Sequence, residues 1–386
     1  MSNVLTLMLT DACNCTCSYC YQRASGNQKI GKLDLETVDK LEKLLPGFQT
    51  IQFFGGEPLL AEDYIFALDS KIDQLMKEQV LTSKPEYVFS SNLVFLSDKF
   101  KAFLHKLSKE QTAFSFIITV DGNKFIHNVN RVLNNGEGTY KKILDNYRFL
   151  IENNMDCVDV IYVVYNNMHY KNGISLQDCI EDIVRNFPTV KYVNFNRESL
   201  FDQTKISEDL FFELKYDLVK RIFEDIVQGG NQYINCAPFL KRELLDLFIS
   251  ILTDHSDVKK CVMDGRKMSV IPTGEVFMCV DQYYASQDAL ASLDQGDDLL
   301  RTMENYVLQN NEKPVQCQEC PVRVLCRLCP MKKGIETDCS QNKKFYKMVL
   351  SYLQKTYSDQ KLIRYFARYS GITDGMIFSF YKYLKG

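Results

Sequence analysis

The sequence predicts an α/β protein in which six strand–helix units form an open, partial (β/α)6 barrel, followed by a smaller cysteine-rich region. Two observations predict this architecture. Residues 1–228 alternate short β-like runs with longer segments of helical period, which is typical of βαβ units and a parallel sheet. Polar residues follow four successive strands, at the strand ends where such sheets bind ligands. Because a closed barrel has eight units, six units predict a partial barrel.

Six short apolar or aromatic runs are the expected strands of the barrel. They are Val4–Leu9, Thr50–Phe54, Tyr87–Ser90, Phe114–Val120, Val158–Val164 and Tyr192–Phe195. The segments between them carry apolar residues at helical spacing, such as Ile65, Leu68, Ile72 and Leu75. The expected helices are Leu35–Leu45, Ala61–Lys77, Asp98–Leu107, Tyr140–Glu152, Leu176–Asn186 and Glu208–Val227.

The bulk properties of the chain exclude several classes of function. A chain of 386 residues exceeds the usual size of one domain, so we expect two. A net charge of −3 gives no electrostatic reason to expect nucleic acid or a membrane surface as a partner. Residues 1–3 lack the features of a signal peptide, and no apolar run approaches the roughly 20 residues that span a bilayer. We therefore expect a cytoplasmic protein.

Four of the 14 cysteines gather directly after the first expected strand. Disulfides are disfavoured in the cytosol, so grouped cysteines there indicate a metal site or catalysis. The pattern Cys13-x3-Cys17-x2-Cys20 places three thiolates on one loop, enough to hold three corners of an iron–sulfur cube and leave one iron open. Zinc is the alternative, because thiolates also bind zinc tetrahedrally and Cys15 would supply the fourth ligand.

Polar groups also follow the next three strands. Gly55-Gly56-Glu57-Pro58 follows the second strand, and paired glycines let backbone approach a ligand closely. Ser91-Asn92 follows the third strand, and Asp121-Gly122 follows the fourth, with His127 and Arg131 shortly after it. We expect these residues to meet at one edge of the sheet.

Together these residues resemble the radical S-adenosylmethionine (SAM) family, whose signature has the same cysteine spacing. Gly55, Gly56 and Glu57 match the segment that receives the amino group of the methionine part. Tyr19 matches the residue whose backbone meets the adenine, and Arg131 matches an arginine near the SAM carboxylate. The resemblance implies that a [4Fe-4S] cluster on the three cysteines binds SAM.

Two further positions complete this resemblance. Asn92 stands where the family has asparagine-glycine, although Leu93 replaces the glycine. Thr119-x-Asp121-Gly122 resembles the family's serine-x-aspartate-glycine. The resemblance thus adds Asn92 and Thr119 to the expected SAM-binding residues.

A second cysteine group lies beyond a connector at residues 229–260, which opens on Gly229-Gly230-Asn231. Lys267–Ile271 and Val276–Cys279 flank Pro272-Thr273-Gly274-Glu275, which predicts a β-hairpin. The cysteine order resembles the SPASM extension of peptide- and protein-modifying radical SAM enzymes, with two residues between Cys326 and Cys329 where three are commoner. We assign it to residues 261–345, with a helical tail at 346–386. A zinc ribbon is the alternative.

The SPASM resemblance implies two auxiliary [4Fe-4S] clusters, three clusters in all. The ligands of one would be Cys317, Cys320, Cys326 and Cys339. The ligands of the other, nearer the active site, would be Cys261, Cys279 and Cys329. Cys236 or a substrate thiolate would be its fourth ligand.

The resemblance predicts an enzyme that abstracts hydrogen from a substrate residue through a 5′-deoxyadenosyl radical and needs an external one-electron reductant. The leading hypothesis is a peptide maturase that installs a thioether or similar crosslink in a ribosomally synthesised, cysteine-containing peptide. The alternative is an anaerobic sulfatase-maturing enzyme, which converts a cysteine or serine to formylglycine. Asp281 is the candidate base, although Val280 occupies the place of the aspartate in sulfatase-maturing relatives. An alternative from a different class of function is a zinc-binding adaptor protein without catalytic activity.

Overall fold

The computed structural model describes residues 3–24, 30–198, 201, 203–228, 267–284, 287–296, 298–309 and 335–356. These residues belong to two compact units. The first unit comprises residues 1–162, 186–189 and 262–311, and the second comprises residues 163–185, 190–261 and 312–386.

A parallel sheet in the first unit carries most of the predicted strands. Its strands β1 (Val4–Thr10), β3 (Thr50–Gly55), β4 (Glu86–Ser90), β5 (Phe114–Thr119) and β7 (Val158–Tyr165) are neighbours in chain order. Each pairs in parallel with the next. Chain-order pairing is what right-handed βαβ units produce. The predicted fold class, a mixed α/β partial barrel, is confirmed.

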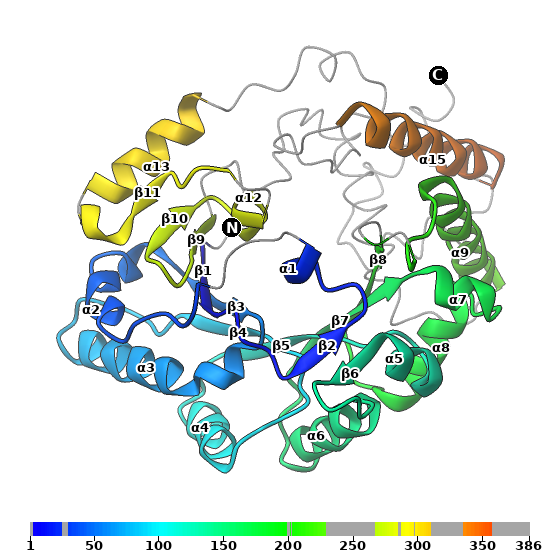
Figure 1. Cartoon of the computed structure of the whole chain (residues 1–386). Helices are drawn as coiled ribbons and strands as arrows, with labels where there is room; N and C mark the ends of the chain where they lie inside the picture. The colour runs from blue at the N-terminus through cyan, green and yellow to red at the C-terminus, as the bar shows by residue number, and fades with distance from the viewer. Residues whose placement is uncertain are drawn as a thin grey trace. The chain divides into compact units, whose positions relative to one another are not determined.

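The helices between these strands lie on one side of the sheet (Figure 1). They are α2 (Thr37–Leu41), α3 (Glu62–Lys77), α4 (Asp98–Lys109), α5 (Lys124–Asn130) and α6 (Tyr140–Glu152). Their buried positions recur at helical spacing, as with Ile65, Leu68 and Ile72 of α3. The helix predicted over Leu35–Leu45 is shorter than expected, because a 3-10 helix at Leu45–Gly47 contains Pro46 and breaks the α-helical pattern.

The predicted hairpin near residue 270 is confirmed and extends the same sheet. β9 (Lys267–Val270) and β10 (Glu275–Phe277) pair antiparallel, with Val276 opposite Val270. β9 also pairs in parallel with β1, and β11 (Ala291–Ser292) follows β10, so the first unit's strand order is β11-β10-β9-β1-β3-β4-β5-β7. The short α12 (Val280–Tyr284) and α13 (Asp298–Gln309) complete this part.

The second unit contains the last residues of β7, with β8 (Tyr192–Arg197) as their neighbour. Its helices are α7 (Asn167–Lys171), α8 (Leu176–Asn186, whose last residue belongs to the first unit), α9 (Glu208–Gln228) and α15 (Ile335–Thr356). α9 packs on α15 through aromatic pairs, including Phe212 with Phe345 at 5.3 Å between ring centroids. α15 covers residues 346–356 of the predicted helical tail, whose remaining residues lie outside the described part of the chain.

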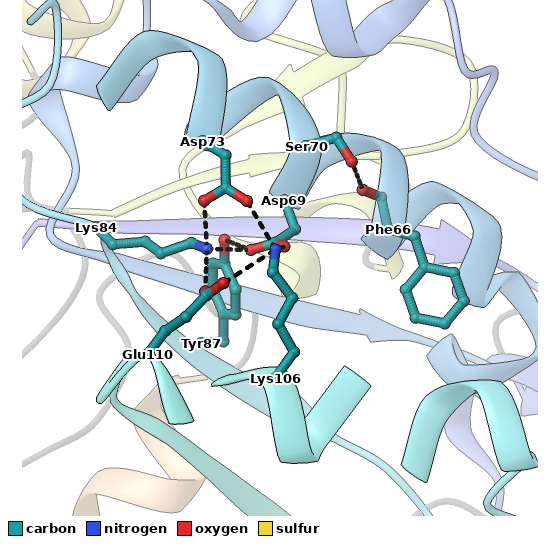
Figure 2. A network of polar contacts seen from close by, with 8 residues as sticks. All are labelled: Phe66, Asp69, Ser70, Asp73, Lys84, Tyr87, Lys106 and Glu110. Atoms are coloured by element: carbon teal, nitrogen blue, oxygen red, sulfur yellow. Dashed lines mark hydrogen bonds and ion pairs between the residues drawn. The ribbon is translucent and has the colours of Figure 1, made fainter. Parts of the chain in front are cut away.

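Charged side chains join α3 to α4 beside the start of β4 (Figure 2). Asp69, which is 3% exposed, accepts hydrogen bonds from Lys106 and from the Tyr87 hydroxyl, the latter at 2.9 Å. Lys84 Nζ lies 2.7 Å from carboxylate oxygens of both Asp69 and Asp73. The network lies at the amino end of β4 and stabilises the packing of α3 and α4. It is therefore at the opposite end of the strand from the expected ligand-binding edge.

Among the helices that the structure describes, none combines the length and apolarity needed to cross a lipid bilayer.

Candidate active site

The first cysteine loop is fixed to the barrel by a small second sheet. β2 (Cys15–Cys17) pairs antiparallel with β6 (Arg131–Leu133), which places Cys17 opposite Arg131. The Ser18 amide donates to the Asn130 carbonyl at 2.8 Å, and the loop ends at α1 (Tyr21–Ala24). The loop between β1 and α1 is therefore held on a defined path, although no helix or long strand contains it.

Three thiols of this loop, those of Cys13, Cys17 and Cys20, are partly buried and electrostatically close. Burial raises the pKa of Cys17, Arg131 opposes this rise, and negative charge on Cys13 and Cys20 adds to it. A set of mutually repelling thiolates is stabilised by a cation, so the donor set fits a thiolate-ligated cluster.

Cys15 interacts directly with Cys13. Its backbone amide donates to Cys13 Sγ at 3.4 Å. The neighbouring Cys15 lowers the pKa of Cys13 to about 6, whereas the interaction with Cys13 and burial raise the pKa of Cys15.

The paired glycines after β3 lie against the backbone of the cysteine loop. Gly55 has φ +141°, and a Cβ there would lie 2.3 Å from the Thr10 carbonyl oxygen. A Cβ on Gly56 would lie 2.3 Å from the Ala12 carbonyl oxygen. The Gly56 amide donates to Thr10 O at 2.8 Å. The glycines are therefore required where two chain segments converge below the loop.

Glu57 is 2% exposed and accepts three hydrogen bonds. The Ser91 hydroxyl and the Leu59 amide donate to Oε1 at 2.8 and 3.1 Å, and the Asn92 amide donates to Oε2 at 2.7 Å. Burial raises the pKa of Glu57 to about 7, although these hydrogen bonds act to lower it. The site therefore contains a carboxylate whose charge a bound ammonium would stabilise.

Asn92 contacts the cysteine loop through its side chain. Its Nδ2 donates to Asn14 Oδ1 at 2.7 Å and lies 3.3 Å from Cys15 Sγ and 3.8 Å from Cys13 Sγ. The next residue, Leu93, is fully buried and adopts φ +53°, the left-handed conformation that favours glycine. The backbone shape of an asparagine-glycine turn is thus kept without the glycine.

Tyr19, Asp121 and Arg131 form a buried chain of polar groups. The Tyr19 hydroxyl donates to Asp121 Oδ2 at 2.5 Å and accepts from an Arg131 terminal nitrogen at 3.2 Å. The Nε of Arg131 is buried and has no hydrogen-bond partner among the described residues. A buried guanidinium N–H of this kind can donate a hydrogen bond to a bound anion.

A second chain of hydrogen bonds ends at the backbone carbonyl of Arg131. The Asp121 amide donates to His127 Nδ1 at 3.2 Å, so Nε2 carries the ring proton and bonds Thr139 Oγ1 at 2.8 Å. Thr139 donates onward to the Arg131 carbonyl at 3.0 Å. Burial and the Arg131 charge lower the pKa of His127, which keeps the imidazole neutral. Sequence reasoning missed Thr139, since no motif marks it.

Of the remaining expected site residues, some lie in the described part of the chain and others lie outside it. Thr119 ends β5, two residues before Asp121. Asp281 is exposed on α12, and its charge adds to partial burial in raising the pKa of Tyr21, the residue after Cys20. Cys279 directly precedes α12 and is partly buried. Cys339 lies in α15, whereas a further set lies outside the described residues: Cys236, Cys261, Cys317, Cys320, Cys326 and Cys329. Within the described ranges, no three His, Cys, Asp or Glu side chains converge on one metal-ion position.

Residues 7–171 match the profile of the family described as "Radical SAM superfamily". This match covers the cysteine loop, Glu57, Asn92 and Arg131. The chain is 22% identical to the cysteine-type anaerobic sulfatase-maturating enzyme of Clostridium novyi, over 82% of this chain and 84% of that protein. It is also 22% identical to the radical SAM cyclopropyl synthase TigE of Paramaledivibacter caminithermalis, over 82% of this chain and 64% of that protein.

A third relative matches a shorter region. The chain is 29% identical to the GTP 3',8-cyclase of Aquifex aeolicus over 35% of this chain and 41% of that protein. The chain thus spans 41% and 64% of the lengths of this cyclase and of TigE.

Solved structures share the fold. anSMEcpe with bound AdoMet has a TM-score of 0.69 and 18% identity, covering 92% of this chain and 98% of that one. Streptococcus suis SuiB bound to its precursor peptide SuiA has a TM-score of 0.53 and 12% identity, covering 84% of this chain and 71% of that one. At these identities the likeness establishes the fold, including the partial barrel.

Proposed function

The chain belongs to the radical SAM superfamily through residues 7–171, and we propose that it is a peptide maturase. Its substrate is a ribosomally synthesised, cysteine-containing peptide in which it forms a thioether or similar crosslink. Relatives named for cyclopropane formation and sulfatase maturation support a peptide or protein substrate, as do structures of relatives with bound peptides.

One observation carries the proposal: the β2–β6 pairing sets Cys17 opposite Arg131, whose buried Nε has no acceptor among the residues that the structure describes. In the proposed site, Cys13, Cys17 and Cys20 hold a [4Fe-4S] cluster. Arg131 receives the carboxylate of SAM, because a guanidinium binds carboxylates well. Glu57 receives the ammonium group, and the orientation of the bound amino acid follows from these two opposite charges.

The remaining contacts complete the SAM site. The Tyr19 backbone meets the adenine, while its side chain orients Arg131 through the 3.2 Å hydrogen bond. Gly55 and Gly56 let the Glu57 segment approach the cysteine loop, and Asn92 and Thr119 line the strand ends. The chemistry that the bound cofactors supply is reductive cleavage of SAM to a carbon radical that abstracts hydrogen from the substrate. An external one-electron reductant starts each turnover.

Asp281 is the proposed base for the substrate proton, supported by its exposed position near Tyr21 and therefore near the end of the cysteine loop. We further propose that residues 261–345 form a SPASM domain with two auxiliary clusters, after a barrel at 1–228 and a connector at 229–260, and before the tail at 346–386. Cys279 and Cys339, with the five other cysteines named for this region, are the proposed ligands.

Formylglycine formation is the second candidate, favoured by the coverage of 84% of a sulfatase-maturating relative. Anaerobic incubation with SAM, a reductant and candidate peptides, followed by tandem mass spectrometry, separates the two reactions. A crosslink that resists thiol alkylation supports the maturase. An aldehyde trapped by hydrazine supports formylglycine formation and overturns the crosslinking proposal.

The triple variant C13A/C17A/C20A tests the catalytic class. We expect it to lose all release of 5′-deoxyadenosine from SAM and the iron and sulfide of one cluster, while the remaining iron stays bound. Retained SAM cleavage would contradict the proposed site. Zinc with negligible sulfide in the anaerobically purified wild-type protein would instead identify a zinc-binding adaptor.

A further inference from the structure

Two polar side chains, those of Gln52 on β3 and Ser90 on β4, lie next to each other on the face of the sheet that points away from the helices. The helix-facing side is marked by Phe89, whose ring centroid lies 5.3 Å from those of both Phe100 on α4 and Phe53. Side chains alternate between the two faces of a strand, so Gln52 and Ser90 lie on the opposite face. Both are partly exposed, whereas Phe53 and Phe89 are buried.

Two hydrogen bonds fix the carboxamide of Gln52. Thr6 Oγ1 on β1 donates to Gln52 Oε1 at 3.2 Å, and Thr6 is the register partner of Gln52. Gln52 Nε2 donates to Ser90 Oγ at 2.8 Å. A carboxamide has two N–H donors and two acceptor lone pairs, so these bonds leave one donor and one acceptor of Gln52 unused by the described residues.

The surface around this pair is apolar and partly open. Val88 on β4 is the register partner of Gln52, and Ile117 on β5 is the register partner of Ser90. Both are partly exposed, as is Phe54, two residues after Gln52 on the same face. Ligand sites typically combine apolar surface with a few polar groups that fix the orientation of the ligand. Hydrogen bonds are also stronger in such surroundings than in water.

The pair lies farther from the strand ends than the residues proposed to bind SAM. Gln52 precedes Gly55 by three residues, a distance of roughly 10 Å at about 3.3 Å per residue. Ser90 is the last residue of β4 and directly precedes the two residues that hydrogen-bond to Glu57. A group bound by Gln52 would therefore lie beside the proposed SAM site, on the same face of the sheet.

We propose that Gln52, oriented by Thr6 and Ser90, binds the backbone N–H and C=O of one extended residue in the substrate peptide. This inference rests on the peptide substrate of the proposed function. The N–H and C=O of one residue in an extended chain point to the same side, as in the hydrogen-bonded residue pairs of an antiparallel sheet. The unused N–H of Gln52 donates to the peptide carbonyl, and the unused lone pair accepts the peptide N–H. Gln52 thus selects for a peptide chain, whatever its side chains, and no covalent bond changes in this step.

The test uses two small probes and needs no turnover. One is N-acetylcysteine methylamide, and the other is its depsipeptide analogue, in which an oxygen replaces the cysteine N–H. Saturation-transfer NMR measures the dissociation constant of each probe for the full-length protein, assembled anaerobically with SAM and without a reductant. The wild-type protein should bind the analogue about two- to tenfold more weakly, the usual net effect of one hydrogen bond.

Three variants show whether Gln52 causes this difference between the probes. Q52M should abolish it, because methionine has a similar length and no amide. S90A should reduce it, because Gln52 loses a hydrogen bond that orients it. The matched control is Q74M, the same change at an exposed glutamine of α3, which should keep the wild-type difference. Both probes are compared within each variant, so a general loss of stability does not mimic the expected result.

Several results would overturn the inference. One is an equal difference between the probes in wild type and Q52M, and another is a wild-type protein that binds both probes equally or binds neither. Weaker SAM binding in Q52M with an unchanged difference between the probes would assign Gln52 to the SAM site instead. Since neither probe is converted to product, failure of crosslinking with every candidate peptide would sink the proposed reaction and leave this inference standing.

Discussion

Tyr284, the last residue of α12, lies edge-on against Tyr21, the first residue of α1, with ring centroids 4.7 Å apart and planes at 88°. α1 follows Cys20 directly, and α12 follows Cys279. The Tyr284 hydroxyl points to Met8 Sδ at 3.7 Å, on the strand that leads to the cysteine loop. The ring pair thus ties the segment that carries Asp281 to the end of the first cysteine loop.

We expect Y284A to lower peptide modification at least several-fold and leave SAM cleavage without peptide nearly unchanged. An edge-to-face pair contributes about 0.5–1.5 kcal/mol, and its loss releases α12 and Asp281 from the loop. Y284F is the matched variant, because it keeps the ring and loses only the hydroxyl. Product and 5′-deoxyadenosine, quantified together by mass spectrometry, check this. Equal loss in both variants would assign the effect to the hydroxyl.

The barrel could be predicted because its signal is local. Each strand is a short apolar run, and the residue groups around Glu57 and Asn92 follow strand ends, which a parallel sheet brings to one edge. The backbone conformation at Leu93 could not be predicted in this way. The sequence reveals that a glycine is replaced, but only the backbone shows that the left-handed conformation is retained.

Other parts of the site depend on contacts between distant residues. Tyr19 and Asp121 are separated by 102 positions, and no periodicity pairs their side chains. β2 has three residues, too few to give an alternating pattern. β9 pairs with β1, with Lys267 opposite Val4, and a hairpin signal at residues 267–279 does not reveal this distant partner.

Glu57 should make the stability of the apoprotein depend on pH. Its pKa is about 7 in the fold against an ordinary value of 4.5, so the folded state holds its proton more tightly. The stability from this difference is complete below pH 4.5 and is lost as pH rises to about 7, a change of roughly 3 kcal/mol. Urea unfolding of metal-free protein between pH 4 and 8 should show this decline, and E57Q should remove it. E78Q, at the exposed end of α3, should keep the wild-type slope.

L93G should destabilise the protein although it relieves the backbone. A left-handed conformation costs a non-glycine residue about 1–2 kcal/mol. Removing a fully buried leucine costs about 2–5 kcal/mol, so the lost packing outweighs the relieved backbone strain, by up to about 4 kcal/mol. The control is Q111G, which changes an exposed residue with φ +57° just beyond α4. Q111G should stabilise the protein by up to about 1 kcal/mol, and chemical denaturation measures both changes. A stabilised L93G would mean that strain, not packing, dominates at this turn.

The charged network between α3 and α4 should respond strongly to K84M. Lys84 is 12% exposed and contacts three carboxylates, those of Asp69, Asp73 and Glu110, so its loss leaves buried negative charge short of a partner (Figure 2). Breaking such a buried pair costs about 3–5 kcal/mol. K106M should cost less, because Lys106 is 38% exposed. The matched control is K141M on α6, whose Nζ pairs with Asp145 on an exposed helix face, and we expect a change below about 0.5 kcal/mol.

The pH dependence of K84M distinguishes charge from packing. Burial acts to raise the pKa of Asp73, but hydrogen bonds from Lys106 and Lys84 outweigh it and lower that pKa. A depressed carboxyl pKa contributes stability near neutral pH that disappears as pH falls through the folded value. The difference in unfolding free energy between wild type and K84M should therefore shrink from pH 7 toward pH 3. A difference that stays constant across this range would show that the lysine's methylene chain, and not its charge, stabilises the α3–α4 contact.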